Sequence, residues 1–146
     1  MRPGVRLAID VGTVRVGIAR SDPSGLLALP VETVNREVAH ARVAELLTEW
    51  NPLEIIVGLP LSLAGRDTPS TTDAREFAAT LAESQSVPVR VVDERLTTVS
   101  AQQALRDTGH SAKSSRSRID QAAAVILLQH CLDGERSTGH PPGQVV

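Results

Sequence analysis

The sequence predicts a three-layer α/β domain in which helices cover both faces of a five-stranded mixed sheet. The chain begins with large apolar residues that alternate with small or polar ones, a pattern that predicts antiparallel strands. Helical spacing then alternates with short, nearly continuous apolar runs, which predict strands that are covered on both faces. The resulting order is three antiparallel strands, helix, strand, helix, strand and two helices, which favours a mixed sheet between two helical layers.

Two strands joined by a tight turn are predicted at the start of the chain. Large apolar side chains occupy every second position there, namely Val5, Leu7, Ile9 and Val11. The period of two places the carboxylate of Asp10 on the opposite face of the strand. Gly12 and Thr13 permit a reversal, and Gly17 in the second strand leaves room for a group close to its backbone. An acid at the end of such a hairpin is a candidate for binding a cation.

A third strand and a first helix follow this hairpin. The turn residues 22–25 lead into an extended run at 26–34, which completes three antiparallel strands. A helix is then expected from an N-cap at Asn35 to the stop signal at Asn51 and Pro52. Its apolar residues recur at helical spacing, so one stripe of this helix faces the core.

The next elements are a central strand, a second helix and a fifth strand. Residues 54–59 form a nearly continuous apolar run, which predicts a strand parallel to its neighbour and covered on both faces. A polar loop follows, and Ser70 and Asp73 form a plausible capping box for the second helix. Residues 87–92 predict a short fifth strand.

The last part of the chain is predicted to be helical apart from one basic loop. We expect a helix over 96–107, a loop over 110–118 rich in small and basic residues, and a final helix over about 118–132. The loop carries three fixed positive charges and no large apolar residue, so an anionic partner is expected to order it. Residues 1–134 then form one domain, and residues 135–146 form a flexible tail.

Composition limits the classes of partner. The chain of 146 residues has 15 basic and 17 acidic side chains and a net charge of -2, so contact with nucleic acid must use a local basic patch. Trp50 and Phe77 are the only Trp, Phe or Tyr residues, which argues against aromatic platforms for stacked bases. The single Cys131 and four scattered histidines favour neither a disulfide nor a zinc site. With no signal peptide or membrane span expected, the sequence predicts a cytoplasmic protein without a membrane partner.

Three acidic residues stand where strands or helices meet loops: Asp10, Glu94 and Asp120. Each has an ordinary structural interpretation, because Asp10 can cap a turn, Glu94 can favour the start of a helix, and Asp120 can complete a capping box with Ser117. Together they can chelate Mg²⁺, which prefers a few carboxylates and lets a substrate phosphate complete its shell. Paired ions of this kind orient a water and stabilise the leaving oxygen of a phosphodiester.

Four segments together resemble the YqgF family, also called RuvX: IDVGTVRVGIARSD, IIVGLPLSLAGR, VDERLTT and IDQAAAVILLQ. They span nearly the whole chain, from Leu7 to Gln129. The resemblance implies a ribonuclease H-like fold with strand order 3-2-1-4-5 and a relation to Holliday junction resolvases. It also implies a nuclease that matures the ends of pre-16S ribosomal RNA, with Asp10, Glu94 and Asp120 as ligands of Mg²⁺ or Mn²⁺.

The implied strand order raises a problem for Glu94. The fifth strand lies two places from the first, which is ~10 Å of sheet. Glu94 must therefore lean inward, or Asp93 or the substrate must help to complete the site. Candidates for substrate binding are polar or basic residues near the acids: Arg95, Arg116, Arg66, Lys113 and Thr13. Weaker candidates are Arg15, Arg20, Arg118 and Ser62.

The leading hypothesis is a metal-dependent nuclease that hydrolyses phosphodiester bonds in pre-16S rRNA. An alternative is resolution of branched DNA, which needs two active sites in a symmetric homodimer. A further alternative is that Asp-x-Gly-Thr, which begins at Asp10, is a phosphate-binding loop like that of sugar kinases and actin. Proteins of that superfamily close two domains over ATP. The non-enzymatic alternative is an assembly factor for the ribosome or the transcription machinery.

Overall fold

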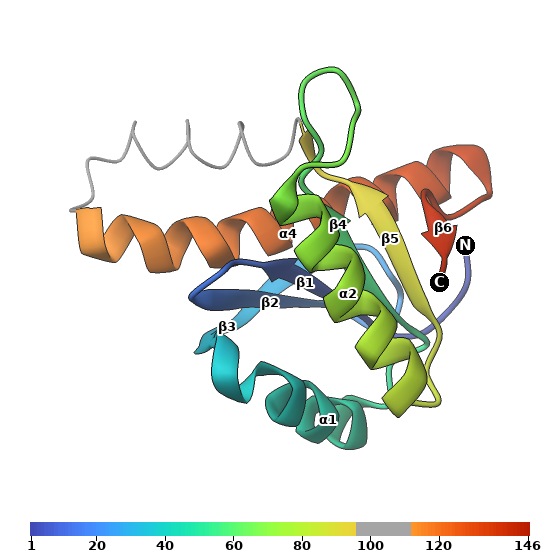
Figure 1. Cartoon of the computed structure of the whole chain (residues 1–146). Coiled ribbons are helices and arrows are strands. Elements are labelled where there is room, and N and C mark those ends of the chain that lie inside the picture. Colours follow the sequence, from blue (N-terminus) through green and yellow to red (C-terminus); the bar gives the residue numbers. More distant parts are fainter. Residues whose placement is uncertain (96–111) are drawn as a thin grey trace.

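A mixed sheet with the strand order β3-β2-β1-β4-β5-β6 forms the centre of the computed structural model (Figure 1). The structure describes the backbone of residues 1–95 and 112–146 and the side chains of residues 1–95 and 122–146. The antiparallel part consists of β1 (Arg6–Val11), β2 (Arg15–Ser21) and β3 (Ala28–Asn35). Next to β1 lie the parallel strands β4 (Glu54–Leu59) and β5 (Val89–Asp93), and the antiparallel β6 (Gln144–Val145) closes the edge.

Helices cover both faces of this sheet, as predicted (Figure 1). One face packs against α1 (Ala39–Trp50) and α2 (Pro69–Ser84), through a core that includes Leu46 and Phe77. The other face packs against α4 (Ala112–Thr138), whose Leu127 and Leu128 are fully buried. Every residue of β4 is buried, which confirms its predicted central position.

The two faces of the sheet carry side chains of different size. Large residues such as Leu7 and Ile9 face α1 and α2, whereas the α4 face carries Ala8, Ala19 and Ala28 on neighbouring strands. Small side chains let a helix backbone approach the sheet closely. The face that also carries Asp10 is therefore the one that α4 covers.

The prediction of five strands is wrong by one, because residues after α4 return to the sheet. Gly139 and Gly143 adopt positive φ angles of 80° and 84°, which reverse the chain. Val145 then pairs with Arg90, and the Val146 N–H donates to Val89 O at 2.8 Å. Both glycines lie within the predicted flexible tail and form a turn there. The flexibility of residues 135–146 concerns motion and stays a prediction.

The predicted boundaries of the last helix are also wrong. The helix α4 begins at Ala112 and ends at Thr138, so residues 112–118 of the predicted basic loop are helical. The sequence has neither Gly nor Pro between Gly109 and Gly134, so nothing interrupts the helix. The predicted helix over 96–107 lies outside the described residues.

Both predicted helix caps differ in detail. At α2, Thr68 and Thr71 form the capping box, with Pro69 as first helical residue, in place of Ser70 and Asp73. At the other helix, Asn35 makes no side-chain capping bond.

A short 3-10 helix, η1 (Arg36–Val38), precedes α1 and shifts its start to Ala39. The predicted stop is confirmed, because Asn51 ends α1 in the left-handed conformation with φ 45°. Across the described residues, the structure contains no helix with the length and apolar character needed to cross a membrane.

Candidate active site

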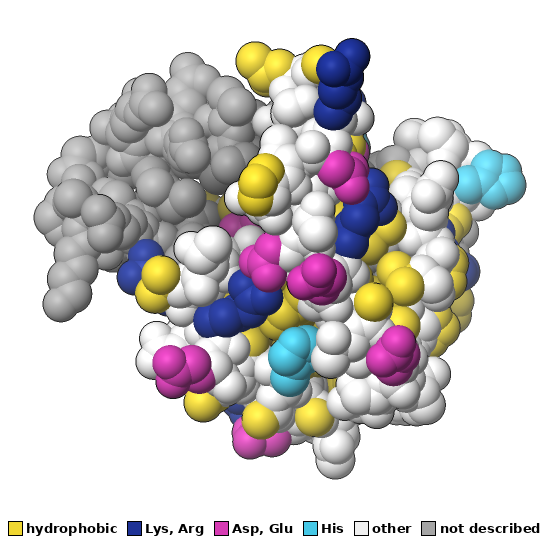
Figure 2. All heavy atoms as spheres, viewed as in Figure 1, with side chains coloured by type: hydrophobic (Ala, Val, Ile, Leu, Met, Phe, Trp, Pro, Cys, Tyr) yellow, Lys and Arg dark blue, Asp and Glu magenta, His cyan; other side chains and the backbone are white. Residues whose placement is uncertain are grey.

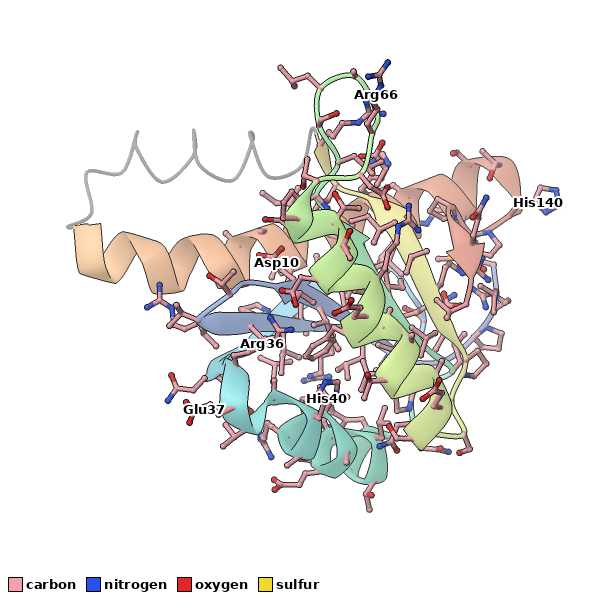
Figure 3. All side chains as sticks on the ribbon, in the orientation of Figure 1. Asp10, Arg36, Glu37, His40, Arg66 and His140 are labelled. Atoms are coloured by element: carbon pink, nitrogen blue, oxygen red, sulfur yellow. The ribbon has the colours of Figure 1, made fainter. Side chains whose placement is uncertain are left out.

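Two carboxyl groups from distant parts of the sequence meet on the α4 face of the sheet. Asp10 lies near the end of β1, on the same face as Ala8 of the core beneath α4 (Figure 3). Glu94 directly follows β5 and shares a face with Val92. A hydrogen bond joins the side chains of Glu94 and Asp10. Because β1, β4 and β5 are parallel, both acids lie at the edge formed by the C-terminal ends of these strands.

The two strands next to Asp10 each carry a glycine, and these glycines leave room for Glu94 to contact Asp10. Gly17 of β2 is the register partner of Asp10, and Gly58 of β4 continues the parallel register on its other side. A Cβ on Gly58 would overlap with Oε2 of Glu94 and would lie 2.8 Å from its Cδ. The Glu94 side chain therefore crosses β4 directly above Gly58. This explains how an acid two strands away leans inward to reach Asp10.

The environment of Glu94 penalises its negative charge. The residue is only 4% exposed. Burial, the charge of Asp10, the hydrogen bond with Asp10 and the charge of Asp93 raise the pKa of Glu94 to about 9. The protonated form of Glu94 is therefore favoured, and in that form its carboxyl group can donate a hydrogen bond to Asp10.

Asp93 is held by a different partner. Its carboxylate accepts hydrogen bonds from the backbone N–H of Arg95 at 3.0 Å and from Nε of Arg95 at 2.9 Å. The side-chain hydrogen bond from Arg95 lowers the pKa of Asp93. Of the two adjacent acids, the structure thus brings Glu94 to Asp10 and engages Asp93 with Arg95.

The loop between β4 and α2, residues 60–68, carries two other sequence-predicted residues. Arg66 is exposed and projects from this loop (Figure 3). Ser62 is used within the loop, since its Oγ accepts a hydrogen bond from the Arg66 N–H at 3.0 Å. Arg95 reaches the same loop, where its guanidinium donates to Leu63 O at 3.2 Å.

Thr13 lines a separate hollow of about 400 Å³, together with Arg36, Pro69, Ser70 and Asp73. Arg36 donates to both carboxylate oxygens of Asp73 at 2.7 and 2.8 Å and to Gly12 O at 2.9 Å. This ion pair ties the β1–β2 turn to α2. It therefore steadies the strand end that carries Asp10.

The predicted residues of α4 lie outside the described side chains. Asp120, Lys113 and Arg116 belong to α4, in the part whose side chains lie outside the described residues. Within the described side chains, no group of three or more His, Cys, Asp or Glu residues forms a metal-binding cluster. Asp10 and Glu94 are therefore a pair there, and the third acid stays a prediction.

The donor set fits a hard divalent cation. Asp10 and Glu94 supply only carboxylate oxygens, the ligands that Mg²⁺ and Mn²⁺ prefer. The close approach of two carboxyl groups marks a position where a positive charge would be stabilised. A divalent cation would supply that charge beside the buried Glu94 and the half-buried Asp10.

The comparison with protein families identifies the chain. The model of the RuvX family, described as Holliday junction resolvase, matches residues 4–134. The chain belongs to the RuvX family. Curated relatives agree over the full chain. A protein of Leifsonia xyli subsp. xyli is 58% identical and one of Clavibacter michiganensis subsp. michiganensis is 55% identical. Each match covers 100% of this chain and 96% or 93% of the relative, and each relative is named "Putative pre-16S rRNA nuclease".

Solved structures confirm the ribonuclease H-like fold of this RuvX chain. RuvC from Thermus thermophilus superposes with a TM-score of 0.56 at 19% identity, covering 97% of this chain and 99% of that one. The structure of T. thermophilus RuvC in complex with a Holliday junction substrate gives a TM-score of 0.58 at 17% identity, covering 98% and 99%. At this level of identity the likeness concerns the fold.

Sequence reasoning missed two features of the site. Gly58 is an isolated glycine inside an apolar strand, and such a glycine signals the close approach of another group. The Arg36 and Asp73 pair had no comparable signal, because it joins residues whose proximity depends on how α2 packs on the sheet.

Proposed function

We propose that this RuvX chain is a metal-dependent nuclease that hydrolyses phosphodiester bonds at the Asp10 and Glu94 pair. The contact between the buried carboxyl group of Glu94 and the half-buried carboxyl group of Asp10 is the observation that carries the proposal. A buried acid pair is costly unless a cation or a proton compensates it, and strongly perturbed acids cluster at functional sites. Membership of a family described as Holliday junction resolvase supports phosphodiester chemistry.

Asp120 is assigned as the third acid. Positions 120, 124 and 127 of α4 follow the i, i+4, i+7 spacing of one helical stripe. Ala124 and Leu127 of this stripe are fully buried, and Leu127 Cδ2 would lie 3.0 Å from a Cβ on Gly58. Leu127 thus lies beside the strand that Glu94 crosses, and position 120 comes two helical turns before Leu127 on the same stripe.

The chain's own residues have distinct roles in this proposal. Asp10 and Glu94, with Asp120, hold Mg²⁺ or Mn²⁺, which supplies Lewis-acid stabilisation of phosphoryl oxygens and lowers the pKa of water when it is bound. Gly58 leaves the space through which Glu94 reaches Asp10, and Gly17, the register partner of Asp10, adds no side chain beside the carboxylates. Helix α4 and the apolar residues under it exclude water from one side of the pair.

The proposed substrate is pre-16S ribosomal RNA, in line with the names of relatives that share more than half of the sequence. Branched DNA is the second candidate, because the family is described as Holliday junction resolvase. Cutting a four-way junction symmetrically requires two copies of the site related by a two-fold axis. A homodimer on the junction would therefore accompany that activity.

The test is cleavage of an end-labelled pre-16S RNA fragment and of a four-way DNA junction, each with Mg²⁺, Mn²⁺ or EDTA. Wild type is compared with Asp10→Asn, and Asp133→Asn is the matched control because it removes an exposed carboxylate from α4. We expect metal-dependent cutting of RNA by wild type and the control, with a loss of at least roughly 10³-fold in Asp10→Asn. A fully active Asp10→Asn variant would refute the acid-pair site.

A further inference from the structure

The tip of the β4–α2 loop presents a large apolar side chain to solvent. Leu63 is 94% exposed, more than any other large apolar residue in the described part of the chain. Single exposed leucines are common on protein surfaces, so exposure alone indicates nothing. The way in which the loop holds Leu63, and the residues to which it is attached, are more informative.

The loop is tied together by its own hydrogen bonds. The Ser62 N–H donates to Arg66 O at 2.9 Å, and the Gly65 N–H donates to Ser62 O at 2.8 Å. Gly65 adopts φ 78°, a conformation that side-chain-bearing residues rarely adopt. At the base, Thr71 Oγ1 donates to Pro60 O at 2.7 Å. A loop backbone held in this way loses little conformational freedom when the loop binds a partner.

The tip is also hydrogen-bonded to Arg95, the residue that follows Glu94 of the acid pair. Arg95 donates to the backbone oxygen of Leu63, and its Nε bonds Asp93. Glu94 lies between these two residues in sequence, and its own N–H donates to Leu59 O at the end of β4. Arg95 therefore holds Leu63 at a fixed position relative to Glu94. The loop projects beyond the sheet at the edge where β4 and β5 end (Figure 1).

The charge at the tip suits a polyanion. Arg66 is exposed next to the apolar tip, and Figure 2 shows hydrophobic and basic side chains side by side on this projection. Among the described residues, Arg66 has no ion pair, whereas Arg75 is paired with Asp67 and Arg95 with Asp93. On the rest of the face in Figure 2, basic and acidic side chains are intermixed. The tip thus combines an apolar contact with an unpaired cation.

The aromatic residues of the chain are occupied elsewhere. Phe77 is 2% exposed and stacks on His40 with a distance of 4.1 Å between the ring centroids. The guanidinium group of Arg20 lies over the Trp50 ring, 4.8 Å from its centroid. Both aromatic rings therefore already have a partner, whereas the aliphatic side chain of Leu63 is exposed.

We propose that Leu63 packs against a nucleobase adjacent to the scissile phosphate, while Arg66 binds a neighbouring phosphate. Aliphatic side chains act as wedges against base faces in other nucleic acid complexes. The inference rests on the proposed function, because it assumes that the strand crosses the Asp10 and Glu94 pair. It makes Leu63 a specificity residue that favours unpaired bases, since bases stacked in a regular duplex do not expose their faces.

The test measures base stacking separately from cleavage. Single-stranded RNA oligonucleotides that span a pre-16S rRNA end carry one 2-aminopurine at successive positions, and its fluorescence reports stacking. Binding is measured in EDTA with the Asp10→Asn chain and with the same chain carrying Leu63→Ser. Leu26→Ser is the matched control, since Leu26 is 60% exposed in the turn between β2 and β3. We expect a fluorescence change at one position that is lost in Leu63→Ser, with roughly tenfold weaker binding. The Leu26→Ser control should bind within about twofold of its parent.

The outcomes separate the inference from the proposed function. If the chain cleaves RNA and Leu63→Ser changes neither fluorescence nor affinity, the base contact is refuted and the nuclease stands. If a Leu63-dependent signal appears but wild type cleaves neither RNA nor the DNA junction, Leu63 contacts a base, and the nuclease is refuted together with the placement of that base beside a scissile phosphate. If Leu63→Ser instead converts a dimer into a monomer in sedimentation, the tip is a protein interface and the inference is overturned.

Discussion

Replacing Gly58 with alanine tests whether Glu94 must cross β4 to make the active site. The added Cβ would overlap with Glu94 Oε2 and would lie 2.8 Å from Glu94 Cδ and 3.0 Å from Leu127 Cδ2. Carbon atoms in contact prefer separations of about 3.5–4.0 Å, so the carboxyl group must retreat by roughly 1 Å or more. Glu94 would then no longer reach Asp10.

The expected effects on stability and on activity differ in size. Both obstructing groups are the ends of flexible side chains, so Gly58→Ala should change the free energy of unfolding by no more than about 1–2 kcal/mol. A displacement of about 1 Å at a catalytic group costs on the order of 10²-fold in rate. We therefore expect a folded protein whose metal-dependent cleavage rate falls by roughly 100-fold or more.

The assay pairs urea denaturation with cleavage of the substrate that wild type cuts. Gly134→Ala is the matched control, because its nearest atom, Pro142 Cγ, would lie 3.9 Å from the new Cβ. Gly134 is inside α4, so alanine there should stabilise the chain by up to about 1 kcal/mol and leave the rate unchanged. A Gly58→Ala variant that cleaves at the wild-type rate would show that Glu94 does not act from above Gly58.

Two further predictions concern the metal and the pH dependence of stability. Addition of saturating Mg²⁺ to metal-free protein should raise the Tm of wild type by about 5 °C or more and leave Asp10→Asn unchanged, as measured by calorimetry; an equal rise in both would place the ion elsewhere. The side-chain hydrogen bond from Arg2 lowers the pKa of Glu135 to about 2, so its stabilising effect is complete above the ordinary carboxyl pKa of 4.5 and is lost as the pH falls towards 2. Glu135→Gln should therefore cost roughly 3 kcal/mol in urea unfolding at pH 7, a difference that narrows at pH 3; a difference independent of pH would contradict this linkage.

Local patterns in the sequence predicted much of the fold correctly. Alternation in β1 correctly placed Asp10 on the face opposite to Leu7 and Ile9, because side-chain direction in a strand follows from position alone. The continuous apolar run of β4 correctly indicated a central strand. The boundaries of α4 and the existence of β6 were not predicted, because small polar residues, Gly and Pro are compatible with helix, turn and loop alike.

The sequence by itself determined the family, the layers and the strand end at which Asp10 lies. Only the tertiary structure decided that Glu94, and not Asp93, meets Asp10, and that Arg95 fastens the loop tip beside it. The physical reason is that each contact joins segments that are distant in the sequence. The contact between Glu94 and Asp10 also spans two strands that are not neighbours in the sheet, and it depends on the space above Gly58 in the intervening strand. No local periodicity encodes which side chain fills that space.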